Sequence, residues 1–262
     1  MSTTEPKVTF TQDGSLGTVA LRNPPMNQIN EEVIGDLIAA VDQVEQAQGL
    51  RALMLKGDGD VFSAGAEVDL FVGRRADEMR PLIALFLDLG RRIEALPFPT
   101  LAVAHGICMA GGFELALFCD LIWAVEGTVV GLPESSLGIV PLAGGIERVA
   151  ARAGLGRART IALGGSLYKA EEFATWGVID RVLPAAELGE KAERFAHKLA
   201  DGPTVAYAAI KDIAAAYTRA GVPGADERLL DAAVGLFDTL DAQEGIRSFL
   251  ESGAGHAVYR GE

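Results

Sequence analysis

Several features are scarce in this sequence of 262 residues, and each absence excludes a class of protein. Its two cysteines, Cys108 and Cys119, are too few for a disulfide framework or a cysteine-built zinc site. We expect both to be buried small side chains in a reducing compartment. No run approaches the roughly 18 apolar residues of a membrane-spanning helix. The opening segment, Met1 to Pro6, is polar and lacks the apolar stretch of a signal peptide, so we expect a cytoplasmic protein.

Basic residues are also in short supply. Lysine and arginine total 23 against 36 aspartates and glutamates, which gives a formal net charge of -13. Nucleic-acid binding needs basic patches that neutralise phosphates, and an anionic membrane surface needs the same. The composition therefore predicts neither a nucleic acid nor a membrane as partner.

Standard motifs of several enzyme classes are missing. The chain has no G-x-S-x-G nucleophile elbow, no G-x-x-x-x-G-K-[ST] phosphate loop and no H-E-x-x-H zinc helix. Gly154-Leu155-Gly156 begins a possible dinucleotide motif, but Arg159 stands at the third glycine, so we expect a turn between helices. The three histidines are widely scattered, and we expect His105, at a strand end, to be a hydrogen-bonded structural residue.

The pattern of apolar residues predicts an α/β fold with both sheet faces covered, because strands alternate with helices. Expected strands are Lys7–Gln12, Leu16–Leu21, Ala52–Lys56, Thr100–Ile107, Leu121–Val125 and Thr128–Leu132. Asp13-Gly14 predicts a hairpin, and Asn30 predicts a helix N-cap. Further helices are expected over Ala76–Leu96 and Phe113–Asp120.

Beyond about residue 185 the strand pattern stops. We expect helices at Glu187–Ala200, Thr204–Ala220, Asp226–Thr239 and Ala242–Leu250. The sequence therefore divides into an α/β core, residues 1–185, and a helical C-terminal region, residues 186–262. The apolar faces of these helices pack either against a neighbouring subunit or back on their own core, and the pattern leaves both open.

Three segments carry the candidate chemistry: Phe62–Glu67, Ala104–Leu115, and Gly131–Glu134 with its continuation to Pro141–Gly145. The first two are loops of small residues after strands, which can expose backbone N–H groups. Gly111-Gly112 begins a helix, where free N–H groups and the helix dipole favour an anion. Two such N–H groups from separate loops form an oxyanion hole. Taken singly, each loop is more typical of an ordinary tight turn.

Glu114 and Glu134 are candidates for a general acid and base. Glu114 lies in an otherwise apolar first turn of a helix, where it is either a dipole cap or functional. Glu134 follows Pro133 at a strand end. Burial would raise a carboxyl pKa toward neutrality, as general acid–base catalysis requires. The two lie on different elements, so their spacing does not show whether they meet.

Together and in this order, the three segments resemble the crotonase superfamily, also called the enoyl-CoA hydratase/isomerase family. The F-S-A-G-A-E loop, the G-G-F-E-L-A helix start with its following Cys-Asp, and the P-E…L-G…P-L-A-G-G run all match. Leu21–Asn27 and Glu171–Leu183 also resemble segments of that family. The resemblance covers roughly residues 8 to 250.

The resemblance implies a spiral of ββα units followed by a helical trimerisation region, with trimers that pair into hexamers. It implies an acyl-CoA thioester as ligand. The backbone N–H groups of Ala64 and Gly111 would hold the thioester oxygen. The further implied substrate and CoA contacts are Gly65, Ala66, Glu67, Pro133 and Leu142.

The resemblance also implies a reaction, because hydratases of this family carry both glutamates. Glu114 would activate water, and Glu134 would deliver the proton to the α-carbon of a trans-2-enoyl-CoA. No metal or redox cofactor is needed, since coenzyme A is part of the substrate. Enoyl-CoA isomerisation, thioester hydrolysis and a non-catalytic CoA-binding role are the alternatives. Four departures from the family pattern bear on the substrate: Leu142 where glycine is frequent, Phe113, Ile146 and Glu67.

Overall fold

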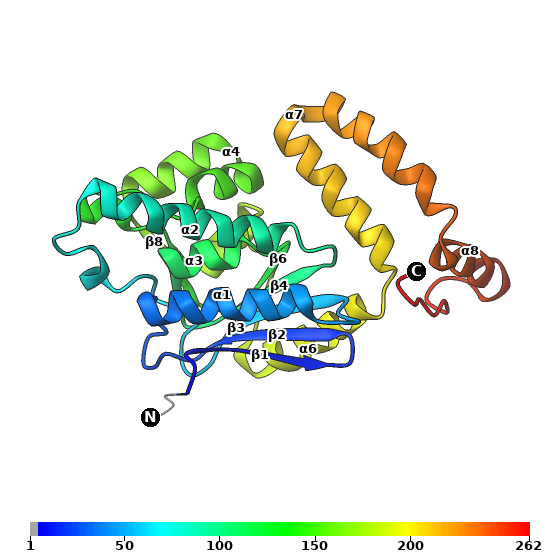
Figure 1. Cartoon of the computed structure of the whole chain (residues 1–262), viewed down its shortest axis with the longest axis horizontal. Helices are drawn as coiled ribbons and strands as arrows, with labels where there is room; N and C mark the ends of the chain where they lie inside the picture. Colours follow the sequence, from blue (N-terminus) through cyan, green and yellow to red (C-terminus); the bar gives the residue numbers. More distant parts are fainter. Residues whose placement is uncertain (1–4) are drawn as a thin grey trace.

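A six-stranded sheet lies at the centre of the computed structural model, which describes residues 5–262 (Figure 1). Residues 1–4, which belong to the polar opening segment Met1 to Pro6, lie outside the described residues. The strand order is β1-β2-β3-β4-β6-β9. The first two strands form the antiparallel hairpin predicted at Asp13-Gly14, and the other neighbours are parallel. The strands are β1 (Val8–Asp13), β2 (Leu16–Leu21), β3 (Ala52–Gly57), β4 (Thr100–Ala104), β6 (Leu121–Val125) and β9 (Arg181–Leu183).

A second sheet of three strands has the order β5-β7-β8 and consists of β5 (Ile107–Met109), β7 (Val129–Gly131) and β8 (Leu167–Lys169). The single strand predicted over Thr100–Ile107 is therefore wrong: the chain leaves the large sheet after β4 and enters the small one at β5. Gly106 allows the break because its φ is +60° and a Cβ there would collide with the backbone oxygen of Asp60.

The helices cover both sheets and form the C-terminal region. They are α1 (Glu31–Gln46), α2 (Ala76–Glu94), α3 (Gly111–Leu117), α4 (Gly145–Gly164), α5 (Ala170–Thr175), α6 (Ala185–Ala200), α7 (Thr204–Leu236) and α8 (Leu240–Ser252), with 3-10 turns η1 (Val68–Phe71) and η2 (Glu134–Leu137). Asn30 is the predicted N-cap of α1, since its side chain accepts a hydrogen bond from the N–H of Val33 at 3.0 Å. Gly154 breaks the helical conformation within α4, as expected for a turn between helices.

Two hydrophobic cores lie on opposite faces of the large sheet. Along β3, Leu53 and Leu55 join the core that contains α1, α2 and α3, whereas Ala52 and Met54 join the core beneath α6. Successive side chains of a strand point to opposite faces, so a strand covered on both faces must be apolar at every position. This double burial explains why the strands are continuous apolar runs in the sequence.

The boundary predicted at residue 185 needs a correction, because α6 belongs to the core. Its alanines Ala192, Ala196 and Ala200 are buried in the second core. Their small side chains at i, i+4 spacing let the helix lie close to the sheet. Phe195 stacks on Trp123 of β6, with ring centroids 4.7 Å apart. The region that leaves the core therefore begins at α7.

The helices α7 and α8 extend to one side of the core (Figure 1). Gly221 interrupts α7 with a non-helical conformation, which agrees with the two helices predicted there. Arg51 ties this region to the sheet: its guanidinium donates to Thr204 Oγ1 at 2.8 Å and to the backbone oxygen of Tyr259 at 3.1 Å. No helix among residues 5–262 is both long and apolar enough to cross a bilayer.

Candidate active site

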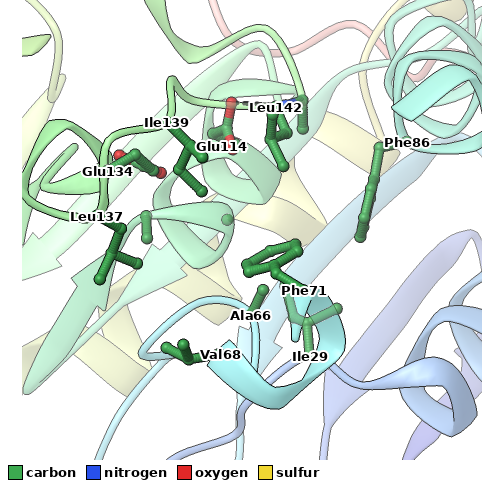
Figure 2. A pocket seen from close by; sticks show the side chains of 13 residues that line it. Ile29, Ala66, Val68, Phe71, Phe86, Glu114, Glu134, Leu137, Ile139 and Leu142 are labelled. Atoms are coloured by element: carbon green, nitrogen blue, oxygen red, sulfur yellow. Dashed lines mark hydrogen bonds between the residues drawn. The ribbon is translucent and has the colours of Figure 1, made fainter. Parts of the chain in front are cut away.

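The carboxyl groups of Glu114 and Glu134 line the same cavity (Figure 2). Their spacing in the sequence did not show whether they meet. Both glutamates line the cavity wall, and Phe71 and Val68 lie across from them. Every other lining side chain is apolar or absent: Ile29, Ala66, Val68, Phe71, Phe86, Ala110, Gly111, Leu137, Ile139, Leu142 and Ala143. The cavity thus combines two acids with an apolar wall.

Glu114 is fixed by the loop that precedes α4. The residue lies in the first turn of α3 and is only 2% exposed. Its Oε1 accepts hydrogen bonds from the N–H groups of Ala143 and Gly145, both at 2.8 Å. Burial raises the pKa of Glu114 to about 7; the two N–H donors lower it in part, and Glu134 and Glu147 raise it. A pKa raised in this way suits the carboxyl group to accept and release a proton.

Glu134 carries an unsatisfied acceptor. It begins the turn η2, after β7 has brought the chain to the cavity. Within the described residues its Oε2 is buried and has no hydrogen-bond partner. Burial raises the pKa of this carboxyl group as well. An unpaired buried acceptor costs about 1–3 kcal/mol, so its presence calls for a protonated carboxyl or for a ligand or water that donates to it.

The predicted N–H donor Ala64 is already engaged, because it donates to the backbone oxygen of Met26 at 3.0 Å. This bond corrects the prediction that Ala64 contributes to an oxyanion hole. Ala66, two residues further along the same loop, fits the role instead. Ile29 accepts from the N–H of Glu67 and donates to the oxygen of Gly65, so it bonds the residues on either side of Ala66. In such a parallel bridge the N–H of the middle residue points away from the partner strand.

Gly111 supplies a second free N–H beside Ala66. It is the first residue of α3, which begins earlier than the predicted Phe113, and the first N–H groups of a helix have no partner within it. A Cβ built on Gly111 would lie 3.6 Å from the nitrogen of Ala66, so the two amides are close neighbours. Ala110 before it has a φ of +50°, a strained conformation for a residue other than glycine. This strain lies where the chain turns to present Gly111.

Gly65 shapes the same corner. Its φ is +87°, and a Cβ there would lie 2.7 Å from the Cβ of Ala110 and 3.1 Å from the nitrogen of Gly111. Only glycine therefore lets the two loops approach. The N–H of Gly65 is bound by Ser63 Oγ at 3.1 Å, so Gly65 supports the site without presenting its own donor.

The remaining predicted residues separate into those at the cavity and those beside it. Leu142 lines the cavity, whereas Pro133 does not, and Glu67 accepts a hydrogen bond from Asn30 Nδ2 at 3.0 Å. Phe113 is fully buried against Phe173, with ring centroids 5.0 Å apart. The large side chain of Phe113 therefore packs in the core and does not line the cavity.

Sequence reasoning missed most of the apolar wall of the cavity. Ile29, Phe71, Phe86 and Ile139 come from four separate segments, and each reads as an ordinary core residue in its own segment. No local pattern distinguishes a cavity wall from a packed core, since both require apolar side chains. His105, as expected, is structural: its Nε2 lies 2.9 Å from the backbone oxygen of Gly59.

The two sheets, and the cavity lined by residues of α2, α3, η1, η2 and their flanking loops, define a protein of the crotonase fold. The structure matches that of an enoyl-CoA hydratase from Geobacillus kaustophilus with a TM-score of 0.92 and 26% identity, over 99% of this chain and 98% of the other. It matches the enoyl-CoA hydratase from Bacillus anthracis with a TM-score of 0.90 and 27% identity, over 98% of this chain and all of the other (100%).

The sequence comparisons agree with the fold. The family model described as enoyl-CoA hydratase/isomerase matches residues 11–257, so the chain belongs to this family. A probable enoyl-CoA hydratase from Bacillus subtilis is 30% identical over 249 residues, which span 93% of this chain and 95% of the relative. A probable enoyl-CoA hydratase from Mycobacterium tuberculosis is 31% identical over 210 residues, or 76% of this chain and 77% of the relative.

Proposed function

We propose that this protein is an enoyl-CoA hydratase, which adds water across the double bond of a trans-2-enoyl-CoA thioester to give a 3-hydroxyacyl-CoA. The observation that carries the proposal is the pair Glu114 and Glu134, two carboxyl groups with raised pKa values at one cavity. Burial that raises the pKa of a carboxyl group above its usual acidic range suits that group to exchange protons with a substrate. The names of the relatives point to the same reaction.

The thioester oxygen would accept hydrogen bonds from the N–H groups of Ala66 and Gly111. These donors polarise the conjugated carbonyl, and negative charge collects on its oxygen when water attacks the β-carbon. Losing one such donor typically costs about 2.7–4 kcal/mol of barrier. Because backbone amides stabilise the enolate, the proposed reaction requires no metal or redox cofactor.

The two glutamates take different parts in this proposal. Glu114, held by two N–H donors at Oε1, accepts a proton from the attacking water. Glu134, whose buried Oε2 has no partner within the described residues, carries the proton that reaches the α-carbon. Water thus supplies OH to the β-carbon, Glu134 supplies H to the α-carbon, and a proton shift from Glu114 to Glu134 resets the pair.

The test is incubation of the purified protein with a series of trans-2-enoyl-CoA esters from crotonyl to long-chain. Hydration removes the conjugated double bond, so its absorbance falls and a 3-hydroxyacyl-CoA appears. A shifted double bond with no added water would indicate an isomerase. Free CoA would indicate a thioester hydrolase. Binding of CoA thioesters without any product would indicate a non-catalytic protein, and each of these results would overturn the proposal.

The acyl group is proposed to be a hydrocarbon, since the cavity wall offers it apolar side chains apart from the two glutamates. The side chain of Leu142 forms part of this wall, beside Glu114 (Figure 2). We expect Leu142→Ala to open the cavity and raise the ratio of kcat/KM for longer or branched esters to that for crotonyl-CoA by about tenfold.

The matched control for Leu142→Ala is Leu163→Ala on α4, where the leucine is 80% exposed and does not line the cavity. This control should leave the chain-length preference unchanged. An unaltered preference in Leu142→Ala itself would show that the acyl group lies elsewhere.

We further propose that α7 and α8 mediate self-association into a trimer or hexamer. Large apolar side chains are exposed along them: Leu229, Leu230, Val234, Phe237, Leu240, Ile246, Phe249 and Leu250. Many exposed large apolar side chains on one region of a protein are typical of an interface. The cytoplasmic location expected from the sequence stays a prediction.

Light scattering during size-exclusion chromatography should give three or six times the 27.5 kDa of the chain. Phe249→Glu is expected to shift the protein toward the monomer, because a charge in an apolar interface is costly. Leu163→Glu is the control: this leucine lies on α4 and is 80% exposed, against 62% for Phe249, and its substitution should leave the assembly unchanged. A monomer in the unmodified protein would contradict the proposed assembly.

A further inference from the structure

An arginine holds the far side of the loop that binds Glu114. Arg148 lies in the first turn of α4, and its Nη1 donates to the backbone oxygens of Ala143 at 3.1 Å and Gly144 at 3.2 Å. The same short loop donates the N–H groups of Ala143 and Gly145 to Glu114 Oε1. The loop is therefore held between a guanidinium on its carbonyl side and a carboxylate on its amide side.

The guanidinium itself is anchored to two other elements. Its Nε and Nη2 form a bidentate pair with Glu94 at the end of α2, at 2.7 and 2.8 Å. Its plane lies over the ring of Phe118, 4.7 Å from the centroid. The side chain is only 14% exposed. A rigid fork of five donors can hold Glu94 and two carbonyls together, which the single ammonium of lysine cannot.

The backbone is shaped to meet this arginine. Gly144 has a φ of +90°, and a Cβ at this position would collide with the guanidinium and with the side chain of Glu147. Glycine is thus required where the loop turns its carbonyls toward Arg148 and its amides toward the cavity. Among the described residues, Arg148 does not line the cavity and is joined to the site by its hydrogen bonds to this loop.

We propose that Arg148 is a positioning residue: by holding the carbonyls of Ala143 and Gly144, it keeps the loop amides aimed at Glu114. The expected effect on catalysis rests on the proposed hydratase function. The coupling of Arg148 to Glu114 through the loop rests on the hydrogen bonds alone. It assigns Arg148 no contact with substrate.

The expected consequence is a change in the ionisation of Glu114. Glu134 from η2 and Glu147 from α4 raise its pKa, and the two loop amides lower it. The other elements near Glu114 carry few free charges. Glu94 of α2 is paired with Arg148, and Arg152 of α4 donates to the backbone oxygens of Cys119 and Val178. The strands β4 and β5 carry no charged residue. A loop released by loss of Arg148 would donate less well, so the pKa of Glu114 would rise further.

The closing experiment compares Arg148→Gln with Arg92→Gln. Arg92 makes a similar bidentate pair, with Glu45 at 2.8 and 2.7 Å, but contacts no part of the site. Arg148→Gln should lower kcat about 10²-fold with KM near the unmodified value, because a small misplacement of a catalytic group has such an effect. The acid limb of the kcat–pH profile should move to higher pH. Arg148→Lys should not restore either quantity, and Arg92→Gln should change neither.

A second readout needs no enzymatic activity. Arg148→Gln, Glu114→Gln and the variant with both substitutions form a double-mutant cycle measured by Tm. If the two residues are coupled through the loop, the Tm shift of the double variant differs from the sum of the shifts of the two single variants. The corresponding cycle of Arg92→Gln with Glu114→Gln should be additive. If Arg148→Gln does not fold, Glu94→Gln loosens the same guanidinium and should give a smaller change in the same direction.

The outcomes separate this proposal from the hydratase proposal. Additive Tm shifts with an unmoved acid limb would overturn the positioning role of Arg148. Non-additive shifts in a protein that hydrates no enoyl-CoA would uphold the coupling of Arg148 to Glu114 and overturn the proposed function alone.

Discussion

Glu134→Gln is expected to lower the hydration rate of trans-2-enoyl-CoA by about 10²–10⁴-fold, the range that general acid–base groups contribute. Glutamine keeps the size of the side chain but cannot release a proton to the α-carbon. The buried, unpartnered Oε2 is the atom from which the proton would leave. The measurement is the loss of conjugated enone absorbance on the best ester of the series, with the 3-hydroxyacyl-CoA product identified directly.

Two further variants make this result specific. Glu114→Gln should lose activity to a similar degree, because it removes the acceptor for the proton of the attacking water. Glu193→Gln on α6 removes an exposed carboxylate far from the cavity and should retain full activity. Hydration that persists in Glu134→Gln within tenfold of the unmodified rate would refute the assignment of Glu134.

Glu114→Gln is expected to stabilise the protein at pH 8 by about 3 kcal/mol, while it inactivates the enzyme. Burial raises the pKa of Glu114 from 4.5 to about 7, so at pH 8 the folded chain holds a charge in an unfavourable place. Each pKa unit corresponds to about 1.4 kcal/mol, which sets the size of the expected gain. Glutamine still offers an oxygen to the N–H groups of Ala143 and Gly145 but carries no charge.

The sign of this effect predicts its pH dependence. The folded state binds the Glu114 proton more tightly than the unfolded state, so the free energy of unfolding falls as pH rises from about 4.5 to about 7. The advantage of Glu114→Gln should therefore vanish near pH 4 and be complete at pH 8. Urea unfolding of both proteins at one protein concentration across this range measures the difference.

Glu193→Gln again serves as the control for stability. The side chain is exposed, so its substitution should stay within about 0.5 kcal/mol at every pH. A Glu114→Gln protein that is no more stable at pH 8 than at pH 4, relative to the unmodified chain, would contradict the buried charge. If Glu114→Gln is inactive but has a higher free energy of unfolding, the carboxylate that catalysis needs lowers the stability of the folded protein.

Local chemistry was sufficient to predict much of the fold and part of the site. The hairpin at Asp13-Gly14, the N-cap Asn30 and the interruption near Gly221 follow from turn and capping preferences that act within a few residues. Glu114 was detectable because a carboxylate is unusual inside an apolar run, and Glu134 because it follows a proline at the end of a strand. The family motifs added the order in which these segments occur.

The errors arose where a distant contact decided the outcome. The sequence could not distinguish Ala64 from Ala66 as a donor, since both follow Ser63 in one loop of small residues; the bond from Ala64 to Met26 separates them. The apolar run of Thr100–Ile107 gave no sign that β4 and β5 join different sheets. The helix α6 had an amphipathic pattern that fits either the sheet or a partner.

By itself, then, the sequence determined the α/β class, the family and the two acids, because these depend on residue type and on spacing along the chain. Only the tertiary structure decided that the two acids meet at one cavity, which amide remains free and how Arg148 reaches the loop behind Glu114. Burial and hydrogen-bond competition set these properties, and both depend on groups that are remote in the chain and adjacent only after folding.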